Sequence, residues 1–163
     1  MQRILFITLF FLTALVPPAS LSQAKAQELV IRKSEFRLDV MIGDSVSKSF
    51  PVGLGKNPGD KKKRGDNRTP EGKFRIVQIQ RSGTWTHDFK DGKGEIAGAY
   101  GPWFLRFGSG ESSMKWTGIG IHGTHDPASI GTLATEGCIR LKNEDLQELR
   151  KLVDVGTEVR VLP

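Results

Sequence analysis

Residues 119–141 read IGIHGTHDPASIGTLATEGCIRL. The segment contains Cys138, the only cysteine of the 163-residue chain, with His122 upstream of it and Arg140 shortly downstream. A short apolar run spaced by glycines leads into the histidine and is typical of a strand. A thiol, an imidazole and a guanidinium within one short segment indicate a candidate nucleophilic site.

The chemistry of such a site follows from its residue types. A thiol at its free pKa is mostly protonated at neutral pH, so a nucleophilic Cys138 needs a base, and His122 is the best candidate. This pair suits acyl transfer, in which the thiolate attacks a carbonyl, the imidazolium protonates the leaving amine and a thioester remains. The backbone N–H groups of Gly137 and Cys138 are candidate oxyanion donors, and the Gly123 carbonyl is a candidate to orient the imidazole. Arg140 offers a planar fork that suits a substrate carboxylate.

Each of these residues also has a purely structural interpretation. A lone cysteine is most often buried and inert, a lone histidine is most often a core residue, and Arg140 also fits an exposed place on a strand. A zinc site made by His122, His125 and Cys138 is a further alternative, although the spacing is not a standard zinc pattern and a fourth ligand or a water is needed. We interpret His125 as a loop histidine and His87 as a solvated one.

The first 26 residues have the layout of a secretory signal peptide. Arg3 precedes an apolar run at 4–16, and Ala24-Lys25-Ala26 forms an A-x-A cleavage site. The run is shorter than the roughly 20 residues that a membrane-spanning helix needs; an uncleaved anchor is the alternative. We therefore predict an exported protein of the periplasm or cell wall, with its domain at 27–163.

The net charge of the chain indicates which class of partner it would bind. The formal net charge is +6, and Arg3 and Lys25 of the predicted signal segment contribute to it. A modestly basic exported protein favours anionic surfaces such as cell-wall polymers, whereas nucleic acid is not an expected partner. No second apolar run of membrane-spanning length occurs, so no stable membrane span is expected after signal cleavage. The sequence does not indicate an oligomeric state.

The remaining sequence predicts one mainly β domain with a single helix near the C-terminus. Apolar alternation and short apolar runs predict strands at 29–31, 36–40, 46–54, 73–79, 102–107, 117–121 and 157–162.

The predicted helix begins at Asn143, which is a good N-cap, and carries an apolar stripe at Leu146, Leu149 and Leu152. Between the strands, 55–72 predicts a polar loop whose basic run at 61–64 is interpreted as solvated. The glycine-rich segment 81–100 predicts a loop or hairpin over one face.

The ordered set of motifs resembles the L,D-transpeptidase catalytic domain, also called the YkuD domain. The family pattern is a histidine, a gap, and then Ser/Thr-x-Gly-Cys followed by a hydrophobic residue and Arg or Asn. This chain has HGT at 122–124 and TEGCIRL at 135–141. Further segments that resemble the family lie at 68–74, 126–131, 143–146 and 155–159, so the resemblance covers nearly all of 27–163.

The resemblance implies a β-sandwich with the site at the end of the sheet. It implies Cys138 as nucleophile, His122 as base and the Gly123 carbonyl as orienting group. The expected site is completed by the Gly137 and Cys138 N–H groups as the oxyanion hole and by Arg140 and Thr135 as substrate-binding residues. It implies peptidoglycan stem peptides as substrates, cut after an L-centre with release of D-alanine, and transfer of the acyl group to an amine. No metal or organic cofactor is implied.

Two other functions fit the same scaffold. Water in place of the acceptor amine gives an L,D-carboxypeptidase or a peptide hydrolase, and an unreactive Cys138 gives a non-catalytic wall-binding module. One position departs from the family pattern, because Glu136 stands where the family usually has histidine. A carboxylate there is expected to raise the thiol pKa or to attract a cationic acceptor amine, and to do neither if it points away from the thiol.

Overall fold

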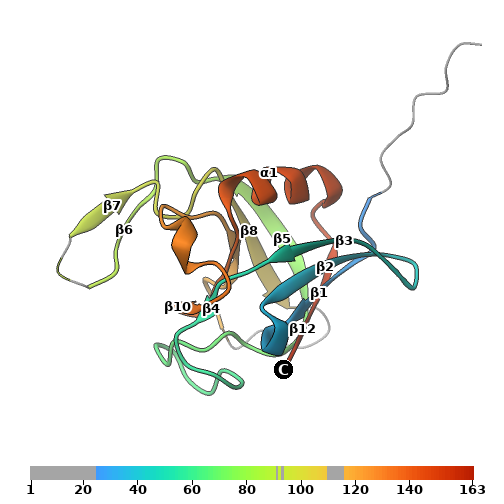
Figure 1. Ribbon diagram of the computed structural model, residues 1–163, viewed down its shortest axis with the longest axis horizontal. Coiled ribbons are helices and arrows are strands. Elements are labelled where there is room, and N and C mark those ends of the chain that lie inside the picture. The colour runs from blue at the N-terminus through green and yellow to red at the C-terminus, as the bar shows by residue number, and fades with distance from the viewer. Residues whose placement is uncertain (1–24, 91, 93, 110–115) are drawn as a thin grey trace, which may run out of the picture.

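The computed structural model of the protein describes residues 25–90, 92, 94–109 and 116–163. The predicted signal peptide lies almost entirely outside the described residues. Eight strands form one sheet in the order β11-β9-β8-β5-β12-β1-β2-β3 (Figure 1). Their bounds are β1 Glu28–Arg32, β2 Arg37–Ile42, β3 Ser45–Pro51, β5 Gly72–Arg81, β8 Trp103–Ser109, β9 Gly120–His122, β11 Ile139–Arg140 and β12 Glu158–Leu162.

Two short strand pairs, one α-helix and two 3-10 turns complete the described elements. The pairs are β4 (Leu54–Gly55) with β10 (Leu133–Thr135), and β6 (Thr86–Asp88) with β7 (Glu95–Ala97). The helix α1 spans Asn143–Leu152, and the 3-10 turns are Lys33–Glu35 and Pro127–Ser129. The prediction of a mainly β domain with one helix near the C-terminus is confirmed. Within the described part of the chain, no helix is long and apolar enough to cross a membrane.

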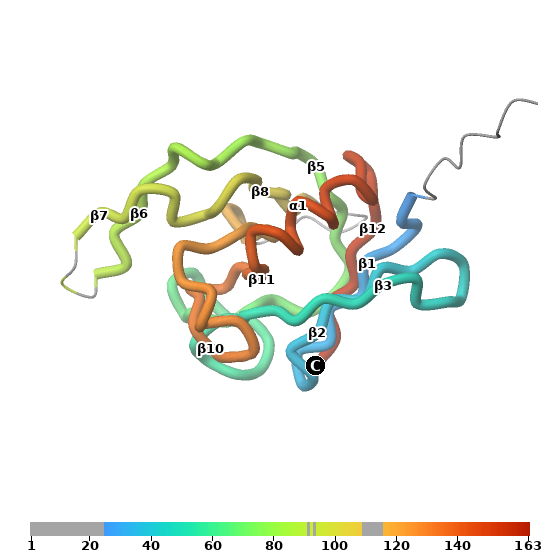
Figure 2. The backbone as a smooth tube through the Cα atoms, turned by 45° about the horizontal axis from the view of Figure 1, so that its top comes forward, coloured from blue at the N-terminus to red at the C-terminus, as the bar shows by residue number. Residues whose placement is uncertain are grey.

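The large sheet curls around its own interior and nearly closes. Its two edge strands are β11 and β3, and the residue pair Gly53 and Arg140 forms a bridge between β11 and the segment that follows β3. The Gly53 N–H donates to the Arg140 carbonyl at 2.8 Å, and the Arg140 N–H donates to the Gly53 carbonyl at 2.9 Å. Figure 2 shows β11 returning towards this segment. The expected β-sandwich is therefore made by two arms of one curled sheet that face each other.

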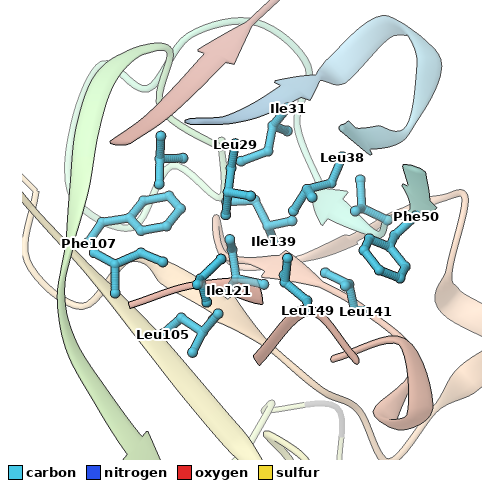
Figure 3. Packing of buried hydrophobic residues seen from close by; sticks show 14 of the residues in the cluster. Leu29, Ile31, Leu38, Phe50, Leu105, Phe107, Ile121, Ile139, Leu141 and Leu149 are labelled. Carbon is cyan, nitrogen blue, oxygen red and sulfur yellow. The ribbon is translucent and has the colours of Figure 1, made fainter. Parts of the chain in front are cut away.

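The core fills the space between these arms. Figure 3 shows side chains from β1, β2 and β3 meeting side chains from β8, β9 and α1. Fully buried members include Leu29, Ile31, Leu38, Phe50, Leu105, Ile121, Ile139, Leu146 and Leu149. Burial of each such side chain stabilises the fold by about 1.5–3 kcal/mol relative to its exposure. The helix contributes the predicted apolar stripe, whose three leucines are buried in this core.

Two sequence predictions about local structure were wrong. The predicted strand 46–54 ends at Pro51, because the chain then leaves β2 and joins β10 through β4. Asn143 is the first helical residue rather than the N-cap, and its side chain bonds the backbone of Thr124 instead of its own helix.

The basic run in the loop between β4 and β5 is only partly solvated. The Lys61 side chain is buried, with Nζ 2.8 Å from the Asp66 carboxylate, whereas Lys62, Lys63 and Arg64 are exposed as predicted. Asp66 also accepts hydrogen bonds from the backbone N–H groups of Lys62, Lys63 and Arg68. These bonds fold the loop against the candidate site, which a fully solvated run would not do.

Candidate active site

Two parallel strands bring the thiol, the imidazole and the guanidinium together. In the register of β9 and β11, His122 lies opposite Arg140. Cys138 precedes Arg140 by two residues, which is the spacing at which side chains of an extended chain share a face. All three side chains line one pocket of about 820 Å³. The structure therefore gathers in one cavity the three residues that the sequence placed in one segment.

The His122 ring is fixed in one tautomer. Its Nδ1 lies 2.6 Å from the Gly123 carbonyl oxygen. A carbonyl only accepts, so Nδ1 carries the proton and Nε2 is the unprotonated, basic nitrogen. The ring stacks on Phe104 and meets the edge of Tyr100, with centroid distances of 5.6 and 4.9 Å. Only 3% of His122 is exposed, and this burial lowers the imidazole pKa to about 3 despite the bond to Gly123.

The backbone on either side of His122 is held at several points. The Leu141 N–H donates to the His122 carbonyl, and the Gly123 N–H donates to the Tyr100 carbonyl. A side chain at Gly123 would lie 2.2 Å from Asn143 Oδ1, so glycine is required where the chain passes under α1. The histidine is therefore positioned by packing and backbone bonds rather than by a carboxylate.

Cys138 is a protonated thiol in the free protein. Its Sγ donates to the Gly118 carbonyl at 3.4 Å. Burial raises the pKa of the thiol to about 11, and Glu136 adds to this rise, whereas a backbone hydrogen bond from Gly120 and the charge of Arg106 oppose it. The side chain remains partly accessible from the pocket. Before substrate binds, the site therefore holds a neutral thiol and a neutral imidazole rather than an ion pair.

The three residues before the cysteine form a tight turn that begins at Thr135. Thr135 is buried, and its hydroxyl donates to the Cys138 carbonyl at 2.6 Å and accepts from the Gly137 N–H at 3.1 Å. The Thr135 hydroxyl and the Gly137 N–H are therefore both hydrogen-bonded within the turn. A substrate role for Thr135 and an oxyanion role for the Gly137 N–H stay predictions, and each would require an exchange of these bonds when substrate arrives.

Arg140 is a buried cation without a carboxylate partner among the described residues. It is 4% exposed, and its Nη1 donates to Ser129 Oγ at 2.9 Å. Its Nε is buried without a hydrogen-bond partner, and its guanidinium carbon lies 5.7 Å from the centre of the Phe89 ring. Burial lowers the pKa of the guanidinium. An incompletely bonded cation at the wall of a pocket is suited to receive an anion.

The sequence did not lead us to predict that residues of the β6–β7 hairpin line the pocket. His87, interpreted above as solvated, lines the pocket with its neighbours Trp85 and Phe89, and its Nε2 lies 3.3 Å from a Glu136 carboxylate oxygen. Trp85, His87 and Phe89 alternate with the period of a strand, His87 within β6 and the other two just outside its ends, and this pattern was the available signal that they share a face. Glu136 also lines the pocket.

His125 packs its ring on Phe89 and is not among the residues that line the pocket. Among the described residues, no three histidine, cysteine or carboxylate side chains converge as a metal site. The zinc alternative therefore gains no support from the described geometry.

Comparison with known proteins agrees with the resemblance. The family model of the L,D-transpeptidase catalytic domain, YkuD, matches residues 26–161. The Bacillus subtilis protein YkuD, named as a candidate L,D-transpeptidase, is 32% identical over 124 residues, which are 76% of this chain and 58% of that protein. A Fuscovulum blasticum protein from the region of the ATP synthase subunits, also named as a candidate L,D-transpeptidase, is 35% identical over 103 residues, or 60% of this chain and 52% of that one. The chain thus spans little more than half the length of these relatives.

Solved structures share the fold. An L,D-transpeptidase from Mycobacterium smegmatis has a TM-score of 0.61 at 20% identity, covering 85% of this chain and 59% of its own. L,D-transpeptidase 3 from Mycobacterium tuberculosis, solved with a faropenem-derived adduct, has a TM-score of 0.60 at 20% identity, covering 85% and 60%. By the match of the family model over residues 26–161, the chain belongs to the L,D-transpeptidase catalytic-domain family.

Proposed function

We propose that this protein is a peptidoglycan L,D-transpeptidase that works through a thioester on Cys138. One observation carries the proposal: a cysteine, a histidine whose basic nitrogen is left free by the Gly123 carbonyl, and an arginine without a carboxylate partner among the described residues line the same pocket. The family assignment supports an acyl-transfer chemistry for these groups. The remaining steps follow from their protonation states.

In the first half-reaction, the neutral pair is activated only as bond formation begins. The Cys138 thiol transfers its proton to His122 Nε2 while Sγ attacks the carbonyl carbon that follows the L-centre of the stem peptide. His122 then gives this proton to the nitrogen of the leaving D-alanine, the C–N bond breaks, and the thioester remains. Because burial disfavours both a lone thiolate and a lone imidazolium, a concerted transfer avoids a separated ion pair.

Substrate recognition is assigned to the cationic wall of the pocket. Arg140 would bind a carboxylate of the stem peptide and so satisfy its free N–H groups. The Cys138 N–H would donate to the tetrahedral oxyanion, and the Gly137 N–H would join it after leaving Thr135. In the second half-reaction, an amine of another stem peptide attacks the thioester and regenerates the thiol.

Export and processing complete the proposal. A substrate in the cell wall requires that the chain cross the cytoplasmic membrane, and the signal-peptide layout of the first 26 residues supports this route. We therefore place the protein in the periplasm or cell wall, with residues 27–163 as the catalytic domain.

Intact-mass analysis tests the proposed function. The purified protein is mixed with a disaccharide-tetrapeptide and sampled on the time scale of one turnover, beside Cys138→Ala as control. A transient adduct on Cys138 with loss of D-alanine and formation of a cross-linked dimer is expected. An adduct that yields only tripeptide would replace the transpeptidase by a carboxypeptidase. Neither adduct nor product, from a protein with native thermal unfolding, would favour a wall-binding module.

A further inference from the structure

The pocket contains a second imidazole that the first half-reaction does not use. His87 lies on the β6–β7 hairpin, which extends from the body of the domain in Figure 1, and its Nε2 is 3.3 Å from Glu136. Its ring meets the edge of Tyr100 with centroids 5.5 Å apart, and Tyr100 in turn meets His122 at 4.9 Å. The two imidazoles therefore lie at different parts of one pocket, with Tyr100 in contact with both.

The contact with Glu136 decides which nitrogen of His87 is basic. A carboxylate only accepts, so Nε2 carries a proton and Nδ1 is the atom able to take one up. A second ring contact with Phe89, at 4.5 Å between centroids, helps to hold the imidazole. His87 is thus built as His122 is, with one nitrogen fixed by an acceptor and the other free to act as a base.

The charges around the pocket indicate which proton this base would accept. Four cations line the pocket, namely Lys61, Arg64, Arg106 and Arg140, and Glu136 is the only acid among the described residues that line it. An acceptor amine arrives as an ammonium ion, which the cations repel and Glu136 attracts. An ammonium ion has no lone pair, so it must lose a proton before it can attack the thioester.

We propose that His87, oriented by Glu136, is the base that deprotonates the acceptor amine. This inference rests on the proposed function above. The ammonium gives one proton to His87 Nδ1, and its nitrogen then forms a bond to the thioester carbonyl carbon as the C–S bond breaks. A second proton of the nitrogen passes through His122 to the sulfur. The products are an amide and the Cys138 thiol, and His87 returns its proton to solvent. His87 is a catalytic residue in this scheme, and Glu136 is its positioning residue.

Other charged groups near the dyad do not take its place. The Asp88 carboxylate is held by Lys90, whose Nζ lies 2.8 Å from it. Arg140, whose guanidinium carbon lies 5.7 Å from the centre of the Phe89 ring, is a cation and cannot act as a base. Tyr100 remains a neutral phenol, because burial first and then the charges of Cys138 and Glu136 raise its pKa. Among the described neighbours of the hairpin, His87 is therefore the group suited to accept a proton from an amine.

The test separates the two half-reactions. The full-length processed protein and the variants His87→Gln and Glu136→Gln are first loaded with a disaccharide-tetrapeptide, and the rate of adduct formation on Cys138 is measured by intact mass. A primary-amine acceptor, glycine amide, is then added, and amide and tripeptide products are counted. His125→Gln is the matched control, because His125 also packs on Phe89 but does not line the pocket.

The expected result is a selective defect. Adduct formation stays within about twofold of the parent in His87→Gln and is equal or faster in Glu136→Gln, whereas aminolysis falls about a hundredfold in His87→Gln and less in Glu136→Gln. Raising the pH restores aminolysis in His87→Gln, since the amine then loses its proton in solution, and a purely structural defect would not recover in this way. The control variant behaves as the parent.

Three outcomes would overturn the inference. Unchanged aminolysis in His87→Gln would show that another group takes the proton. An equal loss of adduct formation and aminolysis, or a loss that high pH does not restore, would show that His87 acts on the structure of the pocket. If the parent itself forms no adduct, the proposed function fails and this inference fails with it, so the two failures are told apart by the parent protein.

Discussion

Asn143 and Thr124 are joined by two hydrogen bonds through the two ends of one side-chain amide. The Thr124 N–H donates to Asn143 Oδ1 at 2.8 Å, and Asn143 Nδ2 donates to the Thr124 carbonyl at 3.0 Å. Thr124 follows the His122-Gly123 pair directly, so the start of α1 holds the loop that orients the His122 imidazole.

Replacement of Asn143 tests this link. Asn143→Ala removes both bonds and should lower the free energy of unfolding by about 2 kcal/mol. Asn143→Asp keeps the acceptor but places a carboxylate against the Thr124 carbonyl, so an equal or larger loss is expected. Urea unfolding at neutral pH measures both changes. A full retention of stability in Asn143→Asp would contradict the bidentate contact.

The buried His122 should make stability depend on acid pH. The pKa of His122 is about 3 in the folded protein, below the 6.5 of a free imidazole, because burial disfavours the charged form. The contribution of neutral His122 is therefore fully present above pH 6.5 and is lost as the pH falls towards 3. The slope is at most about 1.4 kcal/mol per pH unit.

Urea titrations between pH 7 and pH 4 measure this slope. His122→Gln, which cannot titrate, should flatten the pH dependence, whereas His125→Gln should leave it as in the parent. The same slope in His122→Gln and the parent would assign the acid sensitivity to other groups.

The high pKa of the Cys138 thiol predicts slow alkylation at neutral pH. With a pKa of about 11, the thiolate fraction at pH 7 is about one in ten thousand. The rate with iodoacetamide should rise about tenfold per pH unit to near pH 11, and no other cysteine interferes. Arg106→Gln should slow the reaction and Glu136→Gln should speed it, because the two charges act on the thiol in opposite directions. A plateau near pH 7 would instead reveal a thiolate–imidazolium pair.

Gly137 should not tolerate a side chain. Its φ is +133°, and a Cβ there would lie 2.8 Å from the Arg68 carbonyl oxygen of the loop that Asp66 holds. Gly137→Ala is expected to lower stability by about 1–3 kcal/mol and to displace the Cys138 turn, with loss of adduct formation. Gly131→Ala is the matched control, since its φ is +83° but no atom lies within 4 Å of its Cβ position. If Gly137→Ala and Gly131→Ala lower stability equally, the loss would come from backbone strain and not from the contact with the Arg68 carbonyl oxygen.

The sequence indicated His122, Cys138 and Arg140 because these residues lie within one short segment of the chain. His122 is the last residue of β9, Cys138 directly precedes β11, and these two strands pair in parallel. The periodicity of the strands and the glycines that interrupt it can be read from the residues themselves. The apolar stripe of α1 was equally readable, and its three leucines are buried as predicted. The bond from Nδ1 of His122 to the neighbouring carbonyl was expected for the same reason.

The errors concern contacts between segments that are distant in sequence. Asparagine is a residue type that is common at N-caps, but the tertiary structure places the Asn143 amide against the backbone of Thr124 instead. In the sequence, Lys61 is one residue of a basic run that is typical of a solvated loop. Its ion pair with Asp66 forms only because the loop folds back on itself. His87 reaches Glu136 only because the β6–β7 hairpin lies beside the Cys138 turn, and no local pattern encodes that proximity.

The position of β12 within the sheet governs when the domain can assemble. This strand pairs with β5 on one side and with β1 on the other, so it joins the β11-β9-β8-β5 group to the β1-β2-β3 group. Until β12 is available, a growing chain holds two partial sheets without the strand that links them, and both expose apolar faces. The walls of the candidate pocket come from β8, β9, β11 and the neighbouring loops and hairpin. The domain that carries this pocket is thus completed late, after β12 has been synthesised.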